Sequence, residues 1–538
     1  MNLLRRHLHA LREEQGFTMA PVVIAGMLIS LVVAVSLSAA QGDLNLTRND
    51  LDQKQAYEAG RAGLNDYAHH LNNDTNYWSL CTNVPQPSAV NQIGSTANRR
   101  PVPGSTGSSY AIELLPANGQ PSCSTANPTG SMIESGGDAA GTFRIRATGY
   151  AGDSKQSIVA TFKRRSFLDY IYFTQLETSD PVTYGDPATI AGAYQQCTKT
   201  VAGGRNSAPI PGSDPTTYCS QIQFASSDQV KGPFHTNDSI LTCGTPTIGS
   251  SPSDAIEMSA PVTRGGVQYG WTPACGNYTP NFSSTPNLTA PVLTPPPTNA
   301  QLRFVAQSAY RYSCQVRIVL NGTTMTVTKS DGSSSTLPLP PNGVIHVANG
   351  TSACSPSPCS SAYSPYLASY STSSACGNVY IRGTYSGKLT IAAQNDIIID
   401  GNLVRSGDGM LGLIADNFVR VYHPFAAQSA RGNCEGGNNG SGLTGSTSPT
   451  RIDAAILAIQ HSFIVDHFDC GASLGTLTVN GAISQKFRGA VGTGGGSSGT
   501  GYLKDYNYDP RLRYISPPYF LDPIEAAWKT QRETLDFP

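Results

Sequence analysis

Residues 12–40 read "REEQGFTMAPVVIAGMLISLVVAVSLSAA", in which a short charged segment ends at a glycine and a long uncharged segment follows. As a helix rising about 1.5 Å per residue, residues 17–40 reach about 36 Å, enough to cross a hydrocarbon core of about 30 Å. Arg5, Arg6 and Arg12 precede this segment, and the next arginine is Arg48. By the positive-inside rule, this asymmetry places the start of the chain in the cytoplasm.

The apolar segment has three open interpretations: an export signal that is removed, a plain single-pass anchor, or a helix that is retained and takes part in assembly. The apolar region of an export signal usually has about 7 to 15 residues, fewer than are found here. The sequence LSAAQ nevertheless offers a signal-peptidase site after Ala40. Length favours a retained helix.

The helical pattern continues beyond the apolar segment. Apolar residues recur at spacings typical of one face of a helix, which predicts a single helix from about residue 18 to 72. Its second half could pack on a globular head, although Gly60 and Gly63 weaken it locally. The predicted stripe consists of Leu44, Leu51, Tyr57, Leu64, Tyr67 and Leu71.

The sequence "GFTM" followed by a long apolar run resembles the class III signal of type IV prepilins and pseudopilins. The resemblance implies that a prepilin peptidase cuts after Gly16 and that Phe17 becomes the mature amino terminus, usually methylated. It also implies that the apolar helix first anchors the subunit in the membrane and later packs in the core of a filament.

Pro21 departs from the pattern of this family. The fifth mature position usually carries a glutamate, which neutralises the terminal amine of a neighbouring subunit in the apolar filament core. Proline is tolerated in the first turn of a helix, but it offers no charge to pair with that amine, and an unpaired buried charge is costly. The resemblance therefore implies a minor subunit, placed at a filament tip rather than along the shaft.

The composition indicates a loop-rich β protein. The chain has 538 residues, room for several domains. Charged residues make up 13%, about half of the usual share of about 25%, while glycine (54) and proline (37) are frequent. The net charge of −1 predicts no nucleic-acid partner.

All twelve cysteines follow the apolar segment, and an even count there is typical of disulfides formed in an oxidising compartment. The cysteines are scattered without a CxxC pair, which argues against a zinc cluster. Proximity along the chain suggests the pairs Cys81–Cys123, Cys197–Cys219 and Cys243–Cys275, and the remaining pairing stays open.

Residues 76–165 are expected to form a small β head. A hairpin around the turn AGDSK is predicted over 142–165, after an alternating segment at 109–115. Packed against the long helix, this hairpin resembles the layout of a small pilin head, with Trp78 in its core. The inward-facing residues are expected to be Phe143, Ile145, Ala147, Ile158, Ala160 and Phe162.

Beyond a linker and irregular region at 166–220, residues 221–504 contain short alternating strands that recur at short intervals. Asn378, Asn395 and Asn417 each open such a segment and could hydrogen-bond through their amides. This pattern favours a right-handed parallel β-helix, with a sandwich or jelly roll as the alternative. The overall fold class is therefore an α+β pilin-like module followed by a mainly β region.

The tail at 505–538 is expected to cap the last coil of the β region. Solenoids require such a cover on their terminal repeats. The segment PIEAAWK predicts a short helix whose apolar side carries Ile524, Ala527 and Trp528.

Several residues could carry chemistry, because glycosidases need paired carboxylates. Aspartates at 396, 400, 408 and 416 lie in the β region, but strand ends and turns account for them. His235, Asn237 and Asp238 lie in an apparent turn, and His461 and His467 lack a third metal ligand. We therefore predict no catalytic residue, no cofactor and no metal site.

Together these features predict a minor pilin or pseudopilin-like surface subunit that is not an enzyme. It would begin as a single-pass precursor in the bacterial cytoplasmic membrane and end on a surface filament. Its expected partners are the membrane, a prepilin peptidase, other pilin subunits and surface glycans. The alternatives are a membrane-anchored or secreted carbohydrate-active β-helix enzyme and a structural subunit that primes assembly.

Overall fold

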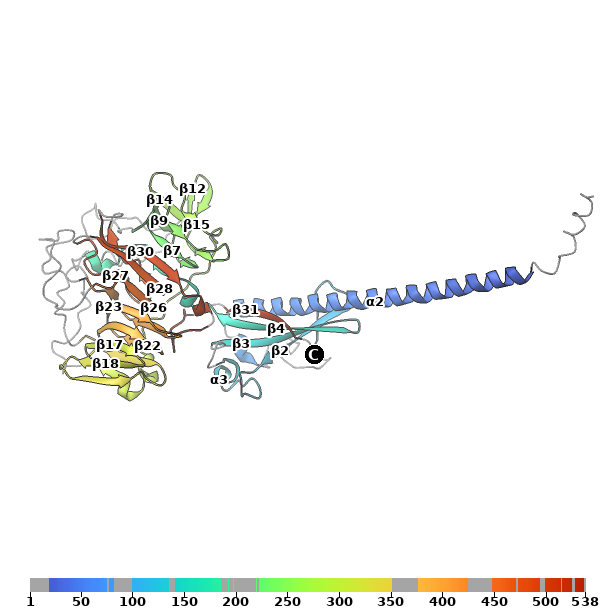
Figure 1. The fold of residues 1–538 in the computed structure, drawn as a ribbon, viewed down its shortest axis with the longest axis horizontal. Coiled ribbons are helices and arrows are strands. Elements are labelled where there is room, and N and C mark those ends of the chain that lie inside the picture. The colour runs from blue at the N-terminus through green and yellow to red at the C-terminus, as the bar shows by residue number, and fades with distance from the viewer. Residues whose placement is uncertain are drawn as a thin grey trace, which may run out of the picture. The chain divides into compact units, whose positions relative to one another are not determined.

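The computed structural model describes residues 19–74, 77–81, 99–134, 141–184, 192, 197, 219, 222–350, 376–423, 448–470, 473–493, 499–513, 515–524 and 528–536. The chain divides into two compact units. The first comprises Met1–Ser135, Gly141–Lys163 and Trp528–Pro538, and the second comprises Gly136–Ala140 and Arg164–Ala527. The second unit is therefore inserted between two segments of the first (Figure 1).

The first unit combines a long helix with an antiparallel sheet, whose strand order is β1-β2-β3-β4-β31. Its helices are α2 (Met19–Asn73), η1 (Tyr77–Leu80) and α3 (Pro128–Met132). Its strands are β1 (Arg100–Pro101), β2 (Ser108–Leu115), β3 (Thr142–Ala151), β4 (Ser154–Arg164) and β31 (Trp528–Asp536).

The predicted hairpin is confirmed by β3 and β4, which pair in antiparallel register with Phe143 opposite Phe162. Alternation places every second side chain of each strand on one face of the sheet. This face is buried against α2, where Leu64, Tyr67 and Leu71 join the same core. The second half of α2 is thus part of the globular unit and not merely a connection to it.

Glycines let α2 approach the sheet closely. A Cβ atom at Gly149 of β3 would overlap the carbonyl oxygen of Ala56 in α2. Leu51, predicted to belong to the apolar stripe, is 52% exposed, whereas its neighbour Asp52 lies close to Gly152 in the turn between β3 and β4. The stripe is therefore shorter at its amino-terminal end than its spacing suggests.

The predicted C-terminal cap is wrong. Residues Thr500–Tyr508 form β30 in the second unit, and Trp528–Asp536 form β31, a strand of the first unit. The indole of Trp528 packs on Phe143 at 4.7 Å and on Trp78 at 5.9 Å between ring centroids. As a strand of this sheet, the tail buries the Trp528 indole in the core of the first unit. A helix on the surface would leave the indole exposed to solvent.

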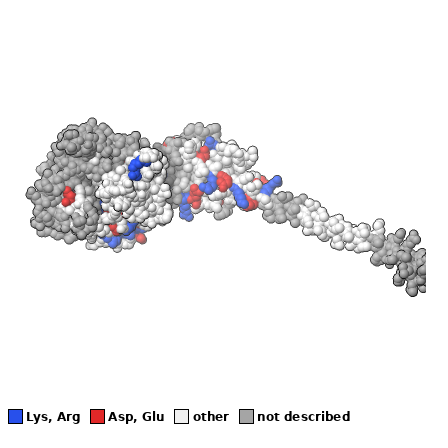
Figure 2. Space-filling view, turned by 90° about the horizontal axis from the view of Figure 1, so that it is seen from above, with Lys and Arg blue, Asp and Glu red and all other residues white. Residues whose placement is uncertain are grey.

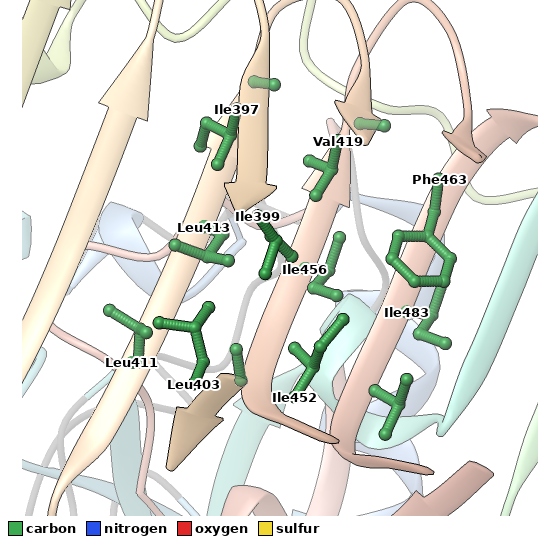
Figure 3. Close-up of a cluster of buried hydrophobic side chains, with 14 of the residues drawn as sticks. Ile397, Ile399, Leu403, Leu411, Leu413, Val419, Ile452, Ile456, Phe463 and Ile483 are labelled. Carbon is green, nitrogen blue, oxygen red and sulfur yellow. The ribbon is translucent and has the colours of Figure 1, made fainter. Parts of the chain in front are cut away.

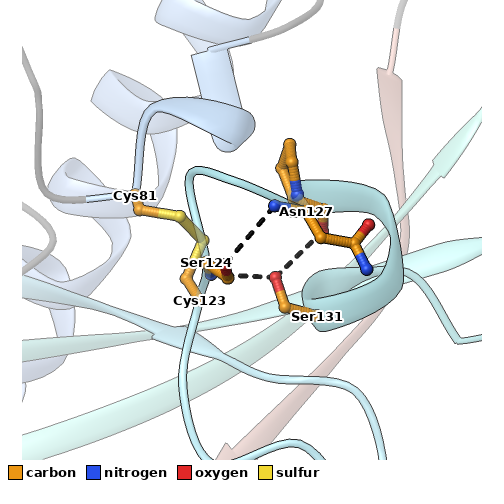
Figure 4. Close-up of a disulfide and its surroundings, with 6 residues drawn as sticks. Cys81, Cys123, Ser124, Asn127 and Ser131 are labelled. Carbon is orange, nitrogen blue, oxygen red and sulfur yellow. Dashed lines mark hydrogen bonds between the residues drawn. A yellow bond between two sulfur atoms is a disulfide. The ribbon is translucent and has the colours of Figure 1, made fainter.

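The structure contains disulfides between Cys81 and Cys123, Cys197 and Cys219, and Cys243 and Cys275, the pairs expected from proximity along the chain. Cys314, Cys376 and Cys470 are disulfide-bonded as well. Figure 4 shows the first pair, which joins the end of η1 to the segment before α3. There the Ser124 amide donates to the Ser131 hydroxyl at 2.9 Å.

The second unit is mainly β, and most of its strand pairs are parallel. One series of strands, which we term the first ladder, runs from β16 to β28, and each strand pairs in parallel with the next. Its strands are β16 (Arg311–Ser313), β20 (Val344–Ala348), β22 (Lys388–Ala393), β24 (Met410–Ala415), β26 (Arg451–Ala458) and β28 (Ser473–Phe487).

What we term the second ladder is also parallel along its main strands. These are β17 (Val316–Gly322), β21 (Val379–Tyr385), β23 (Ile397–Arg405), β25 (Val419–Val421) and β27 (Phe463–Val465). Two antiparallel strands extend it beyond β17, namely β18 (Thr324–Lys329) and β19 (Ser334–Pro338).

Beyond β28 the first ladder divides into two rows of parallel strands. One row contains β30, β7 (Gln229–Lys231), β10 (Thr247–Ile248) and β15 (Asn281–Phe282). The other contains β5 (Tyr172–Leu176), β8 (Phe234–Thr236) and β11 (Ile256–Met258). Because β5 belongs to this sheet, part of the predicted linker at 166–220 is instead an integral strand.

The remaining elements are short. Strands β6 (Gln223–Ala225), β9 (Ile240–Cys243) and β14 (Trp271–Cys275) form a separate parallel sheet, and β12 (Val262–Arg264) pairs with β13 (Val267–Tyr269). Strand β29 (Gly492–Thr493) pairs with β30. The helices are η4 (Phe167–Asp169), η5 (Pro181–Tyr184), α5 (Leu302–Val305), η6 (Ser308–Tyr310) and η8 (Pro510–Arg513).

The largest apolar core of the second unit lies between the ladders, and a second cluster packs around Phe167, Ile414 and Leu457. Figure 3 shows side chains from both ladders meeting in the largest core, among them Ile399 of β23 and Ile456 of β26. Burying a branched aliphatic side chain contributes about 1.5–3 kcal/mol to the free energy of folding. Each strand that adds such side chains to the core therefore stabilises the strands packed beside it.

The three asparagines singled out in the sequence form a hydrogen-bonded row. The Asn395 amide donates to Asn378 Oδ1 at 2.6 Å, and the Asn417 amide donates to Asn395 Oδ1 at 2.6 Å. Each lies just before a strand of the second ladder. The prediction that these amides bond to one another is confirmed.

Candidate functional site

The first half of α2 is an exposed apolar surface. Over Met19–Ser38 the mean hydropathy is 2.5, and none of this segment is buried within the structure. Figure 2 shows no charged atom along the described part of this segment. At about 1.5 Å per residue it is about 30 Å long, long and apolar enough to cross a membrane.

Hydroxyl groups within this segment are satisfied by the helix itself. Ser30 Oγ donates to the carbonyl of Gly26 at 2.8 Å, and Ser36 Oγ donates to that of Val32 at 2.8 Å. In a hydrocarbon environment every polar group must find such an internal partner. The serines therefore do not oppose insertion into lipid.

Pro21 lies in the first described turn of α2. Proline is tolerated in the first turn of a helix, and α2 continues beyond it to Asn73. Gly16 and Phe17, the predicted cleavage junction, lie outside the described residues. The described part of the apolar segment carries no charged side chain, at position 21 or elsewhere.

The aspartates considered as a catalytic pair are engaged separately. Asp396 is buried and accepts from the Phe418 amide at 3.1 Å, and burial raises its pKa. Asp400 is buried 3.3 Å from Arg317, and burial raises its pKa too. Asp416 accepts from Thr298 and Asn299, and burial raises its pKa to about 6.

Asp408 is exposed in a turn of the chain. The four aspartates thus have four different environments, and their hydrogen bonds and ion pairs do not link them to one another. Asp396 and Asp416 are held by hydrogen bonds, whereas the Asp400 carboxylate is close to Arg317 without a hydrogen bond to the described residues.

The sequence did not reveal the buried ion pairs made by Arg420. Its guanidinium lies 2.7 Å from Asp466 and 3.5 Å from Asp396, with all three side chains nearly inaccessible to solvent. An isolated buried charge would be costly, whereas a paired one is tolerated. Arg420 sits within an alternating apolar strand, and only its position on the outward face of β25 could have signalled this role.

The predicted turn around His235 is a buried hydrogen-bonded network. Its imidazole lies 2.9 Å from Glu257 and 3.0 Å from Asn237, and the Asn237 amide donates to the Leu293 carbonyl at 2.7 Å. Burial opposes ionisation of Glu257, but hydrogen bonds from His235 and Tyr170 lower its pKa to about 2. Both ring nitrogens of His235 and the side-chain amide of Asn237 are thus engaged in hydrogen bonds within the fold. Beside this network, Asp238 accepts from the Glu177 backbone amide.

His461 and His467 are not brought together as ligands. His461 lies 3.0 Å from Asp180 and stacks on Phe418, whereas His467 lies 2.8 Å from the carbonyl of His423. Among the described residues, no group of three or more His, Cys, Asp and Glu side chains is placed to hold a metal ion.

A small surface depression is lined by charged residues of β23, β26 and the segment at η8, namely Arg405, Asp453, Asp509 and Arg511. Arg405 and Arg511 both pair with Asp509, at 2.7 and 2.6 Å, and Arg451 pairs with Asp453 at 2.9 Å. Each guanidinium here has a carboxylate partner. Asp453 of β26 also joins its neighbouring strands, since it accepts from the Arg405 amide of β23 at 2.9 Å and from the Asn480 amide of β28 at 2.6 Å.

No protein-family model matches the chain, and no curated protein matches it. Among solved structures, the chain is similar to the competence-associated pilin ComZ from Thermus thermophilus. The two share 13% sequence identity and a TM-score of 0.31, covering 90% of this chain and 98% of that chain. A likeness this low does not establish a shared fold or a shared role.

Proposed function

We propose that this chain is a minor pilin-like surface subunit. The observation that carries the proposal is the construction of α2. One continuous helix has an exposed apolar half, Met19–Ser38, and a second half whose Leu64, Tyr67 and Leu71 are buried in the core of the first unit. Such a helix can anchor a globular unit in a membrane and later pack against other apolar helices.

The proposal includes processing of the precursor. A prepilin peptidase would remove the leader between Gly16 and Phe17, and α2 would stay on the mature chain. Pro21 supplies no carboxylate for the amine of a neighbouring subunit, which favours a position at the filament tip, where no subunit lies ahead.

The second unit is proposed to be a parallel β-helix. Its two parallel ladders, the apolar core between them and its asparagine row support this assignment. Sandwiches and jelly rolls are built from antiparallel pairs, whereas both ladders here are parallel along their main strands.

The proposed role of this second unit is adhesion to surface glycans without catalysis. The separate engagement of Asp396, Asp400 and Asp416 supports a binding role over a hydrolytic one. The test is a glycan array probed with the full chain in detergent micelles, since the core of the first unit needs α2. We expect selective binding; an array without binding would contradict adhesion to glycans, and shortening of polysaccharides would instead support the carbohydrate-active enzyme.

A further inference from the structure

A lysine and an aspartate meet in the interior of the second unit, where β30 lies beside β7. Lys504 Nζ is 2.8 Å from Asp228 Oδ2, and the two side chains are only 11% and 4% exposed. The carboxylate is fixed by its own turn, because the Ala225 amide donates to Asp228 Oδ2 at 3.0 Å. The pair therefore has a defined geometry and little access to water.

Aromatic and cationic groups surround this pair. Phe224 and Tyr506 are buried next to it, and the guanidinium of Arg488 stacks on Phe224 at 3.5 Å. Burial lowers the pKa of Lys504; the charge of Asp228 opposes this effect and that of Arg488 adds to it. This environment makes the neutral amine, the nucleophilic form of lysine, easier to reach than it is in water.

We propose that Lys504 and Asp228 become joined by an intramolecular isopeptide bond. A proton first passes from the ammonium to the carboxylate, converting the ion pair into an amine and a carboxylic acid. The amine nitrogen then attacks Asp228 Cγ, a C–N bond forms, and the C–O bond to the hydroxyl breaks. The hydroxyl leaves as water with the second amine proton, so the step balances without an oxidant or a co-reactant.

Arg488 is positioned to assist this step electrostatically. It is fully buried and held by Glu177 at 3.1 Å and by the carbonyls of Ile222 and Gln223 at 3.0 and 3.1 Å. A fixed positive charge close to a developing oxyanion stabilises the tetrahedral intermediate. We treat Arg488 as a positioning residue, because it bonds neither reacting atom.

The bond would close most of the second unit into a covalent loop. It would join β30 to the turn preceding β7, two strands that lie side by side in parallel register with Asp505 opposite Gln229. Strands far apart in the sequence would then remain paired even when the chain is pulled from both ends. This inference does not depend on the proposed function.

The same two strands offer a matched control. Lys231 of β7 and Asp505 of β30 are also 2.8 Å apart, but their side chains are 39% and 25% exposed. Withdrawal from water disfavours the charged form of a lysine, and only the pair of Lys504 and Asp228 is withdrawn from water. The two pairs have the same distance and differ in burial. Comparing them therefore shows whether burial, and not proximity alone, is needed for the bond to form.

The test is mass spectrometry of the full chain, purified in detergent, reduced and then digested. We expect a peptide in which the Lys504 and Asp228 segments are joined, lighter than their sum by one water. Lys504→Arg and Asp228→Ala should each abolish it, whereas Lys231→Arg should leave it unchanged. If the folded wild-type chain yields both segments only as separate peptides, or if the lost water maps elsewhere, the proposal is overturned, whether or not the variants fold.

Discussion

At the scale of single residues, the closest approach in the first unit is made by two glycines. Gly149 of β3 and Gly60 of α2 face each other across the crossing of helix and sheet. A side chain at Gly149 would overlap the helix backbone, whereas one at Gly60 would find its nearest neighbour, the Ala147 carbonyl oxygen, at 3.4 Å. Position 60 can therefore accept a Cβ atom and position 149 cannot, although both lie at the same crossing of helix and sheet.

This contact predicts opposite effects for two alanine substitutions. Gly149→Ala should lower the free energy of unfolding of the first unit by about 2–4 kcal/mol, because the helix must move away from the sheet. Gly60→Ala should be neutral or stabilising by up to about 1 kcal/mol, since alanine favours the helix. Denaturant unfolding of both variants measures the difference, and equal effects would refute the account of this crossing.

His346 makes the stability of the second unit depend on pH. It is fully buried on β20, with neither ring nitrogen hydrogen-bonded to any described residue. Burial, aided by the charges of Arg303 and Arg311, lowers its pKa to about 4, from 6.5 in the unfolded chain. The unfolded state therefore binds the proton more tightly. The stabilisation by neutral His346 is complete above pH 6.5 and is lost as the pH falls towards 4.

The substitution His346→Leu should remove this dependence. Between pH 7 and pH 4 the wild-type chain should lose up to about 3 kcal/mol more than the variant, given about 1.36 kcal/mol per pKa unit. Asp416, whose pKa is raised to about 6, acts in the opposite sense but cancels in the comparison. Urea midpoints measured across this range give the result, and parallel curves for the two proteins would contradict it.

Residue roles were predictable where they follow from alternation. Phe143 and Phe162 were placed in the core because every second strand residue shares a face, and the structure buries both. The partners of Arg420 and Lys504 were not predictable, because Asp466 and Asp228 lie next to strands that are distant in the sequence. Ion pairs of this kind depend on the register of the sheet, which a single sequence does not specify.

At the scale of elements, the asparagine row joins successive strands of the second ladder. Asn395 is its central member, donating to Asn378 and accepting from Asn417. Asn395→Ala should cost about 1–3 kcal/mol of unfolding free energy, because a buried and a partly buried hydrogen bond are lost. Asn378 Oδ1 keeps its bond from the Asp396 amide.

Asn417→Ala provides the comparison, since it breaks only one bond of the row and should cost about half as much. Denaturant unfolding followed by circular dichroism measures both. If the terminal substitution proves as costly as the central one, the amides do not act as a row.

The tail shows why a helix can be predicted where a strand forms. The segment around Trp528 has an apolar side, which suits a helix locally. Its partner strand, β4, ends at Arg164, and a pairing across so long an insertion leaves no local signal. The parallel ladders were easier to anticipate, because their strands recur at short intervals along the chain.

Trp528 should contribute to the first unit although it follows the entire second unit in sequence. Trp528→Ala should lower the stability of the first unit by about 3–5 kcal/mol, as expected for removing a buried aromatic side chain. Leu535→Ala, on the same strand but 49% exposed, should have little effect. Hydrogen exchange of the β3 and β4 amides reports on this unit directly, and unchanged protection in the Trp528 variant would contradict its place in the core.

At the scale of the whole molecule, the chain combines an apolar helix, a small antiparallel unit and a large inserted β unit. Because both ends of the segment Arg164–Ala527 continue into the first unit, a load applied to this segment would reach the first unit through both of its ends. This arrangement suits a subunit that displays a large domain from an assembled helix.

The mature amino terminus of the protein isolated from its producing cells tests the central claim most directly. Sequencing the terminal peptide distinguishes the three interpretations of residues 12–40. The account predicts a chain that begins at Phe17 and retains all of α2. A chain that begins at Gln41 would have lost its apolar helix as an export signal, and one that keeps Met1 would have only a plain anchor; either result would contradict a pilin-like subunit.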